Sequence, residues 1–165
     1  MVEENKGFDA DFDKVGSGAS TTYPLPVGEL KKGGHCVIGG RPCKIMEITT
    51  SKTGKHGHAK AKIVGVCIFS EKKAEDVQPV SHNKDVPFIT RTEYTIITLL
   101  DDNYISLMDS KGKTRDDLKL PSETEYDKTI AERIKKGIDD GKVMVCTVLA
   151  AMDIEKIEDA KEAQN

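Results

Sequence analysis

Short runs of alternating apolar and polar residues fill the first half of the chain and predict β-strands rather than helices. Residues 37–38 and 43–46 flank Gly39-Gly40, a pair that favours a tight hairpin turn because glycine accepts a positive φ. Pro42 cannot donate a ladder hydrogen bond, so we expect it at a strand start or at a sheet edge.

A second hairpin is expected further along the same half. It pairs residues 45–49 with residues 61–69, and a long loop at residues 50–60 joins the two strands. The half closes with residues 81–87, a polar stretch ended by proline, which we interpret as a linker.

The second half combines strands with one helix. Ser122 and Glu125 have the spacing of a capping box, which predicts a helix start at this point. Ile130, Ile134 and Ile138 then recur every four residues and define one apolar helix face. Strands, a capped helix and a further strand follow the order of a five-stranded OB-type barrel. The predicted strands are 92–100, 104–108, 118–120 and 142–151.

The two ends of the chain differ from the body between them. Residues 1–20 have few apolar side chains and are predicted to be a disordered acidic tail. Residues 153–165 are acidic and are expected to form a frayed helix or a tail. The predicted organisation is therefore one domain at 21–83 and a second at 84–152, with a tail on either side.

Composition excludes membrane and secreted classes. The chain has 165 residues, of which 37% are hydrophobic, and no stretch approaches the roughly 18 consecutive apolar residues of a membrane span. The N-terminus lacks the basic start and apolar run of a secretion signal. The four cysteines form no C-x-x-C pair and are expected to be reduced, mostly buried thiols. We expect a cytoplasmic protein, with the nucleus as a second compartment.

Charge divides the chain into two unlike halves. Residues 21–83 carry ten Lys/Arg and five acids, whereas residues 84–152 carry eleven Lys/Arg and thirteen acids. Only the first half therefore has an electrostatic reason to bind phosphate groups. In its centre, the 23 residues at 48–70 contain no acid at all.

The acid-free stretch predicts a binding loop for a polyanion. It carries four lysines and two histidines, and Gly54 and Gly57 bracket Lys55 and His56 at its tip. Glycine at these positions allows turns that are closed to residues with a Cβ. Binding of RNA or another polyanion is one interpretation, and a solvated basic loop without function is the other.

Other chemistry fits the sequence less well. Gly54-Lys55 lacks the remaining residues of a phosphate-binding P-loop. His56 and His58 could ligate a metal with Cys43 or Cys67, but a second correctly spaced pair is missing, so no metal is expected. A Schiff-base lysine needs a low-dielectric pocket, which a glycine-flanked tip does not offer. The aromatic residues of the second half are interpreted as barrel core: Phe88, Tyr94, Tyr104 and Tyr126.

Residues 51–60 read Ser-Lys-Thr-Gly-Lys-His-Gly-His-Ala-Lys, which resembles the hypusine loop of the eukaryotic translation initiation factor 5A family, a relative of bacterial elongation factor P. The resemblance covers roughly residues 21–152 and includes segments 40–45, 81–83, 85–87 and 116–121. It implies an all-β architecture, with an SH3-like barrel followed by an OB-fold barrel.

The resemblance also implies a function. Lys55 aligns with the lysine that deoxyhypusine synthase and deoxyhypusine hydroxylase convert to hypusine with spermidine as donor. The family binds the ribosome near the E site, reaches toward peptidyl-tRNA and rRNA, relieves stalling at consecutive prolines and assists termination. No bound cofactor is implied, and a weak homodimer is a further expectation. The supporting loop residues would be Lys52, Gly54, His56, Gly57, His58 and Lys60.

Two other functions stay open from the residues themselves. A general RNA-binding protein acting off the ribosome would bind free RNA tightly with a steep salt dependence. An enzyme using Lys55 or the histidine pair would need a lowered lysine pKa or a bound metal. We expect a translation factor rather than an enzyme.

Overall fold

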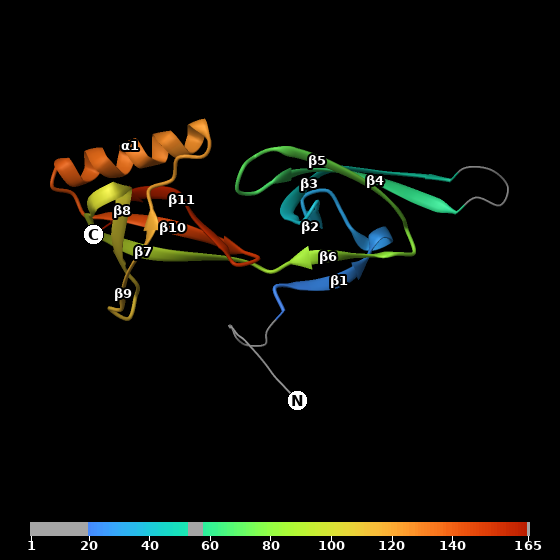
Figure 1. The fold of residues 1–165 in the computed structure, drawn as a ribbon, viewed down its shortest axis with the longest axis horizontal. Helices are drawn as coiled ribbons and strands as arrows, with labels where there is room; N and C mark the ends of the chain where they lie inside the picture. The colour runs from blue at the N-terminus through green and yellow to red at the C-terminus, as the bar shows by residue number, and fades with distance from the viewer. Residues whose placement is uncertain (1–19, 53–57, 165) are drawn as a thin grey trace, which may run out of the picture.

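The computed structural model describes residues 20–52 and 58–164, which form two β-rich bodies that follow one another along the chain (Figure 1). Strands make up 58% of the described residues, which contain one α-helix, so the predicted all-β class is confirmed. We refer to the two bodies as the first and the second barrel. In the described part of the chain, no helix is long and apolar enough to cross a membrane.

The first barrel consists of a four-stranded sheet and a two-stranded sheet, both antiparallel. The two-stranded sheet pairs β1 with β6, and the 3-10 turn η1 (Val27–Glu29) follows β1. The strands are β1 (Thr22–Pro26), β2 (His35–Ile38), β3 (Arg41–Lys52), β4 (Ala59–Cys67), β5 (Lys73–Pro79) and β6 (Asn83–Pro87), and the sheet order is β2-β3-β4-β5.

The predicted first hairpin is confirmed. β2 and β3 are joined by Gly39 and Gly40, whose φ angles are 60° and 78°. A two-residue turn with positive φ at both positions matches the twist of the strands it joins, and glycine adopts it with the least strain. Pro42 is the second residue of β3 and pairs with Val37, so it lies at a strand start as expected.

The second hairpin pairs as predicted, but its strands are longer. The ladder between β3 and β4 continues through the pairs Ser51–Lys60 and Lys52–Ala59. The predicted loop at 50–60 is therefore wrong at both ends. Here the side chains of both strands are largely exposed, so the alternation of apolar and polar residues that marks a half-buried strand is lost.

The predicted linker at 81–87 is wrong. Residues Asn83–Pro87 form β6, and Tyr23 of β1 lies opposite the buried Val86. The first barrel therefore extends past the predicted boundary at residue 83, and only Phe88 separates β6 from the first strand of the second barrel.

The second barrel has the predicted strand order of an OB fold. Its sheet order is β11-β10-β7-β8-β9, which leaves β9 and β11 at the two edges. Arg115 of β9 bridges them, because its guanidinium donates two hydrogen bonds of 2.7 and 2.9 Å to the Glu155 carboxylate of β11. The strands are β7 (Ile89–Leu99), β8 (Tyr104–Met108), β9 (Thr114–Lys119), β10 (Met144–Ala151) and β11 (Ile154–Glu162), with the 3-10 turn η2 (Asp101–Asn103) before β8.

The helix α1 (Glu125–Asp139) covers one side of this barrel (Figure 1). Ile130 and Ile134 are fully buried, as their spacing predicts. The capping box lies two residues later than predicted: the Thr124 hydroxyl accepts from the Asp127 N–H at 2.9 Å, and the Asp127 carboxylate accepts from the Thr124 N–H at 3.0 Å. Because threonine and aspartate have the same capping ability as serine and glutamate, the sequence offers two overlapping boxes.

The predicted tail at 153–165 is wrong, because Ile154–Glu162 forms β11 along β10. Ile157 and Ala160 both face the core, although they are three residues apart. The register shifts between Val148–Ile157 and Thr147–Asp159, so β11 carries one extra residue in a β-bulge. The bulge changes the apolar spacing from two to three, which resembles a helix period in the sequence.

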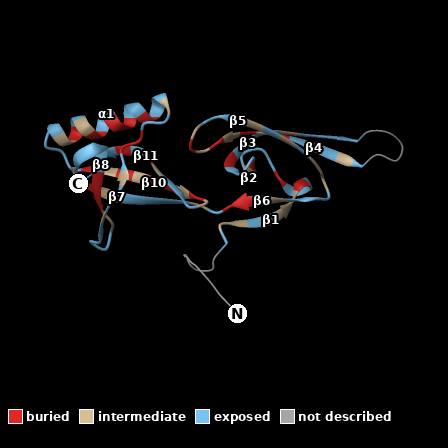
Figure 2. Cartoon of the chain, in the orientation of Figure 1, coloured by how far each residue is buried: buried red, intermediate tan, exposed pale blue. Residues whose placement is uncertain are grey.

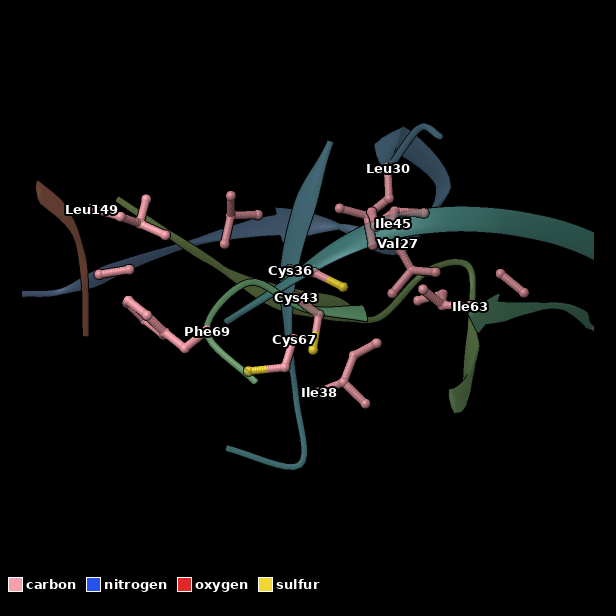
Figure 3. Close-up of a cluster of buried hydrophobic side chains, with 13 residues drawn as sticks. Val27, Leu30, Cys36, Ile38, Cys43, Ile45, Ile63, Cys67, Phe69 and Leu149 are labelled. Atoms are coloured by element: carbon pink, nitrogen blue, oxygen red, sulfur yellow. The ribbon is translucent and has the colours of Figure 1, made fainter. Parts of the chain in front are cut away.

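Each barrel has its own core, and buried segments lie in both barrels (Figure 2). Leu149 and Ala151 of β10 belong to the core of the first barrel (Figure 3). Three cysteines lie opposite one another across β2, β3 and β4, and all four cysteines are free and buried as predicted. The three that share a ladder are Cys36, Cys43 and Cys67.

Candidate functional site

The β3–β4 ribbon projects from the first barrel at the end away from the second barrel (Figure 1). Ala61 is the last buried residue of β4 toward the tip, at 1% exposure. Beyond it Lys52, His58 and Lys60 are exposed. The other predicted loop residues, Gly54, Lys55, His56 and Gly57, lie outside the described residues. The structure therefore places the two strand ends that carry the predicted site.

Lys52 and Lys60 lie on opposite faces of the ribbon. Lys60 pairs with Ser51, and Lys52 pairs with Ala59. Ladder partners share a face and successive residues alternate, so these neighbouring pairs point to opposite sides. The two lysines are both at the base of the loop, but they present positive charge in two directions.

The end of the ribbon at the base of the loop is braced by the rest of the first barrel. The Val80 N–H donates to the Ala59 carbonyl at 3.0 Å, and the Gly28 N–H donates to the Val80 carbonyl at 3.1 Å. Pro79 of β5 lies opposite Lys60. The strand β4, which follows the loop, is thus held by β3 on one side and by residues 79–80 on the other, a role for these residues that the sequence did not indicate. Pro79, at the end of a polar strand, was the available signal.

Acidic residues near the ribbon are engaged with other lysines. Glu75 of β5 contacts Lys73 at 3.3 Å and Lys62 at 3.7 Å. The hydrogen bond from Lys73 and the charges of both lysines hold the pKa of Glu75 below its ordinary value. These contacts leave Glu75 with little net field toward the tip.

Asp76 is engaged in the same way. Burial alone would raise its pKa, but hydrogen bonds from Lys84 and Gln78 outweigh burial and lower the pKa below the ordinary value. Within residues 20–52 and 58–164, neither Lys52 nor Lys60 forms an ion pair. The arrangement is therefore a projecting ribbon with uncompensated positive charge, suited to a polyanion.

Within residues 20–52 and 58–164, all four cysteines are buried and none is grouped with other metal-ligating side chains. Burial raises the pKa of Cys36 to about 11 and that of Cys146 to about 12, so both thiols are protonated at neutral pH. Cys43 and Cys67 lie in the core, whereas His58 is exposed on the projecting ribbon. Among the residues that the structure describes, no three His, Cys, Asp or Glu side chains are grouped as metal ligands.

The predicted burial of the second barrel's aromatic residues is wrong for three of the four. Phe88, Tyr104 and Tyr126 are exposed, and only Tyr94 packs against the core. Phe88 instead contacts Tyr23 with 5.1 Å between ring centroids, and Lys119 lies 5.0 Å from the Tyr104 ring. Isoleucine, leucine and other non-aromatic apolar side chains fill this core, so it needs no further rings.

Comparison with known families gives two matches along the chain. Residues 20–82 match the family model described as "Translation initiation factor 5A-like, N-terminal". Residues 88–161 match the one described as "Eukaryotic elongation factor 5A hypusine, DNA-binding OB fold". The first match ends before β6 and the second begins at Phe88.

Individual relatives agree with these matches. The chain is 49% identical to eukaryotic translation initiation factor 5A-1 of Arabidopsis thaliana, with 92% of this chain and 93% of the relative covered. A solved structure of a translation initiation factor 5A family protein from Naegleria fowleri is 57% identical, covers 86% of this chain and 99% of its own, and superposes with a TM-score of 0.81. The factor from Methanococcus jannaschii is 31% identical, covers 86% and 96%, and gives 0.62.

Proposed function

The chain belongs to the eukaryotic translation initiation factor 5A family, and we propose that it acts as a hypusine-dependent factor that binds the ribosome near the E site. There it promotes peptide-bond formation at stalled sites such as consecutive prolines, and it assists termination. This action takes place in the cytoplasm, where translating ribosomes are found.

Lys55 is the proposed site of modification. Deoxyhypusine synthase would add an aminobutyl group from spermidine, and deoxyhypusine hydroxylase would add a hydroxyl. The product is an elongated dication, which can lie among the phosphates of peptidyl-tRNA and rRNA. Such a group helps a reaction by positioning the reactant without covalent participation. The protein is then a translation factor that assists the ribosome's own chemistry, and not an enzyme.

One observation supports the proposal most strongly: the ribbon that carries residue 55 projects from a braced barrel with uncompensated charge. Lys52 and Lys60 face opposite sides of this ribbon, so they suit a cleft with phosphates on both walls rather than a flat RNA surface. Gly54 and Gly57 would allow the tight turn, and His56 and His58 would extend the contact beside Lys55.

Lys55→Arg tests the proposal. Arginine keeps the positive charge and roughly the length, but its guanidinium cannot replace the primary amine at which modification begins. We expect an unchanged melting temperature, loss of the aminobutyl mass from the intact protein, and loss of stimulation on a proline-rich message in reconstituted translation. Lys62→Arg is the matched control, because Lys62 lies on the same ribbon but contacts Glu75.

Equal activity of Lys55→Arg and the unmutated, hypusine-carrying protein would contradict the hypusine function. Tight, steeply salt-dependent binding of free RNA by both proteins would then favour a general RNA-binding protein acting off the ribosome.

A further inference from the structure

A buried ion pair of the second barrel lies at the junction between the barrels, and its ammonium group also reaches the first barrel. Lys156 of β11 contacts the Asp127 carboxylate at 3.0 Å, and the exposed fractions of the two side chains are 13% and 2%. The same ammonium donates a 2.6 Å hydrogen bond to the carbonyl of Phe69, in the turn between β4 and β5 of the first barrel. One side chain of the second barrel is thus bonded to the backbone of the first.

The surroundings of this ion pair belong to both barrels. Lys156 lies opposite Leu149 in the β10–β11 ladder, and Leu149 packs into the core of the first barrel together with Phe69. Asp127 is the residue that completes the capping box of α1. The helix start, β11 and the β4–β5 turn therefore meet at one ammonium group.

Stability alone is a poor explanation for this arrangement. A buried ion pair loses hydration, and apolar residues of similar volume are often as stabilising or more so. What charged hydrogen bonds add is direction, because an ammonium bonded to a carboxylate and a carbonyl permits one orientation of its neighbours. Apolar contact between barrels is non-directional, and relative motion of domains is the ordinary expectation for a small interface.

We propose that Lys156, with Asp127 and the Phe69 carbonyl, forms a clasp that sets the angle between the two barrels and thereby positions the β3–β4 ribbon. The inference rests on the proposed function, in which the ribosome binds the ribbon at one position and the second barrel at another. Lys156 is a positioning residue that acts through the barrels and touches no substrate.

The geometry of β4 makes this angle matter. β4 has nine residues, and the Phe69 turn follows one end of it while the basic loop precedes the other. At about 3.3 Å per residue the strand spans about 30 Å, so a tilt of about 10° at the clasp displaces the far end by about 5 Å. Displacements much smaller than this are costly when a reaction depends on placement.

Residual dipolar couplings of the isotope-labelled full chain test the clasp directly. We expect a single alignment tensor to fit both barrels in the unmutated protein. In Lys156→Met, which keeps the length of the side chain and removes its charge, we expect two tensors of different magnitude. Lys142→Met is the control, since Lys142 also forms an ion pair in the second barrel, with Glu162 at 3.5 Å, but does not reach the first.

A second readout separates positioning from a purely structural role. Intact mass should show the same hypusine content in Lys156→Met and Lys142→Met. Stimulation of translation on a proline-rich message should fall by on the order of tenfold in Lys156→Met alone. Lys156→Arg, which keeps a charged donor, should restore a single tensor and most of the activity.

The outcomes are decisive in each case. A single tensor in Lys156→Met overturns the clasp. Two tensors in the unmutated protein also overturn it, and this measurement remains valid even if Lys156→Met fails to fold. Two tensors with full activity overturn the positioning role. A failure of the proposed function is distinguished by full activity of Lys55→Arg, which leaves the tensor measurements unaffected.

Discussion

Asp76 keeps a negative charge close to the basic ribbon without cancelling the charge of its tip. Its carboxylate accepts from Lys84, from Gln78 and from the Val77 N–H at 2.9 Å. All three donors belong to the first barrel, and the Lys84 ammonium offsets the negative charge of the carboxylate. A free acid at this position would reduce the attraction of the ribbon for phosphate.

The lowered pKa of Asp76 makes the stability of the first barrel sensitive to acid. Because the folded-state pKa lies below the ordinary value of 3.8, the carboxylate stabilises the fold at pH values above the unfolded pKa. That contribution is lost as the pH falls through the folded-state pKa. We expect Asp76→Asn to lower the free energy of unfolding at pH 7 and to flatten its loss as the pH falls from the ordinary value of 3.8 through the folded-state pKa, measured by urea denaturation.

Asp85→Asn is the comparison, because it removes the same charge from an exposed site on the same barrel. If the free energy of unfolding depended on pH in the same way in Asp76→Asn and in the unmutated protein, Asp76 would contribute nothing to acid sensitivity.

Among the elements, α1 has two overlapping capping boxes in its sequence, which place its start two residues apart. The structure selects Thr124 and Asp127, and Asp127 is also the partner of Lys156. One carboxylate therefore caps a helix and joins the clasp at the same time. An acid in the first turn is further stabilised by the helix dipole.

Two alanine substitutions distinguish the caps. Thr124→Ala removes the acceptor for the Asp127 N–H, and we expect it to lower the free energy of unfolding by about 1 kcal/mol. Ser122→Ala changes an exposed residue before the helix, and we expect an effect below about 0.5 kcal/mol. Chemical denaturation measures both. A larger loss for Ser122→Ala would place the functional cap at the predicted position.

The elements that the sequence predicts well are those whose apolar spacing is regular. The Gly39-Gly40 hairpin, the isoleucine face of α1 and the strand at residues 104–108 are examples. Those that it misses have their spacing broken: β11 by a bulge, and β6 by a polar composition around one buried valine. β6 is fixed by pairing with the distant β1, and β11 by pairing with the preceding strand β10 around its bulge, and the local apolar spacing of neither segment shows this.

On the scale of the whole molecule, positive charge is concentrated on one projecting ribbon. Lys52 and Lys60 are therefore expected to contribute to ribosome binding through phosphate contacts. Each alanine substitution should reduce the slope of log affinity against log salt by about 1, and the double variant by about 2, in a binding titration with increasing potassium chloride. Lys113→Ala, an exposed lysine of the second barrel, should leave the slope unchanged. An unchanged slope in the double variant would remove the ribbon from the interface.

A candidate site is easier to propose from the sequence than the long-range contacts of the molecule around it. An acid-free stretch is visible in one segment, so its charge needs no fold to be recognised. The brace at Val80 and the clasp at Lys156 bring together residues far apart in the chain, such as Phe69 and Lys156. Neither residue type is unusual for its local surroundings, and only the three-dimensional contact identifies them.

The sharing of Leu149 and Ala151 between the barrels has a consequence for how the chain is made. Domains generally fold as units from the N-terminus while synthesis proceeds. Here the first barrel lacks two of its core side chains until β10 has left the exit tunnel. A nascent chain that stops between the barrels therefore leaves an apolar gap beside Phe69, open to chaperones and proteases. The core of the first barrel is therefore completed only after β10, a strand of the second barrel, has been synthesised.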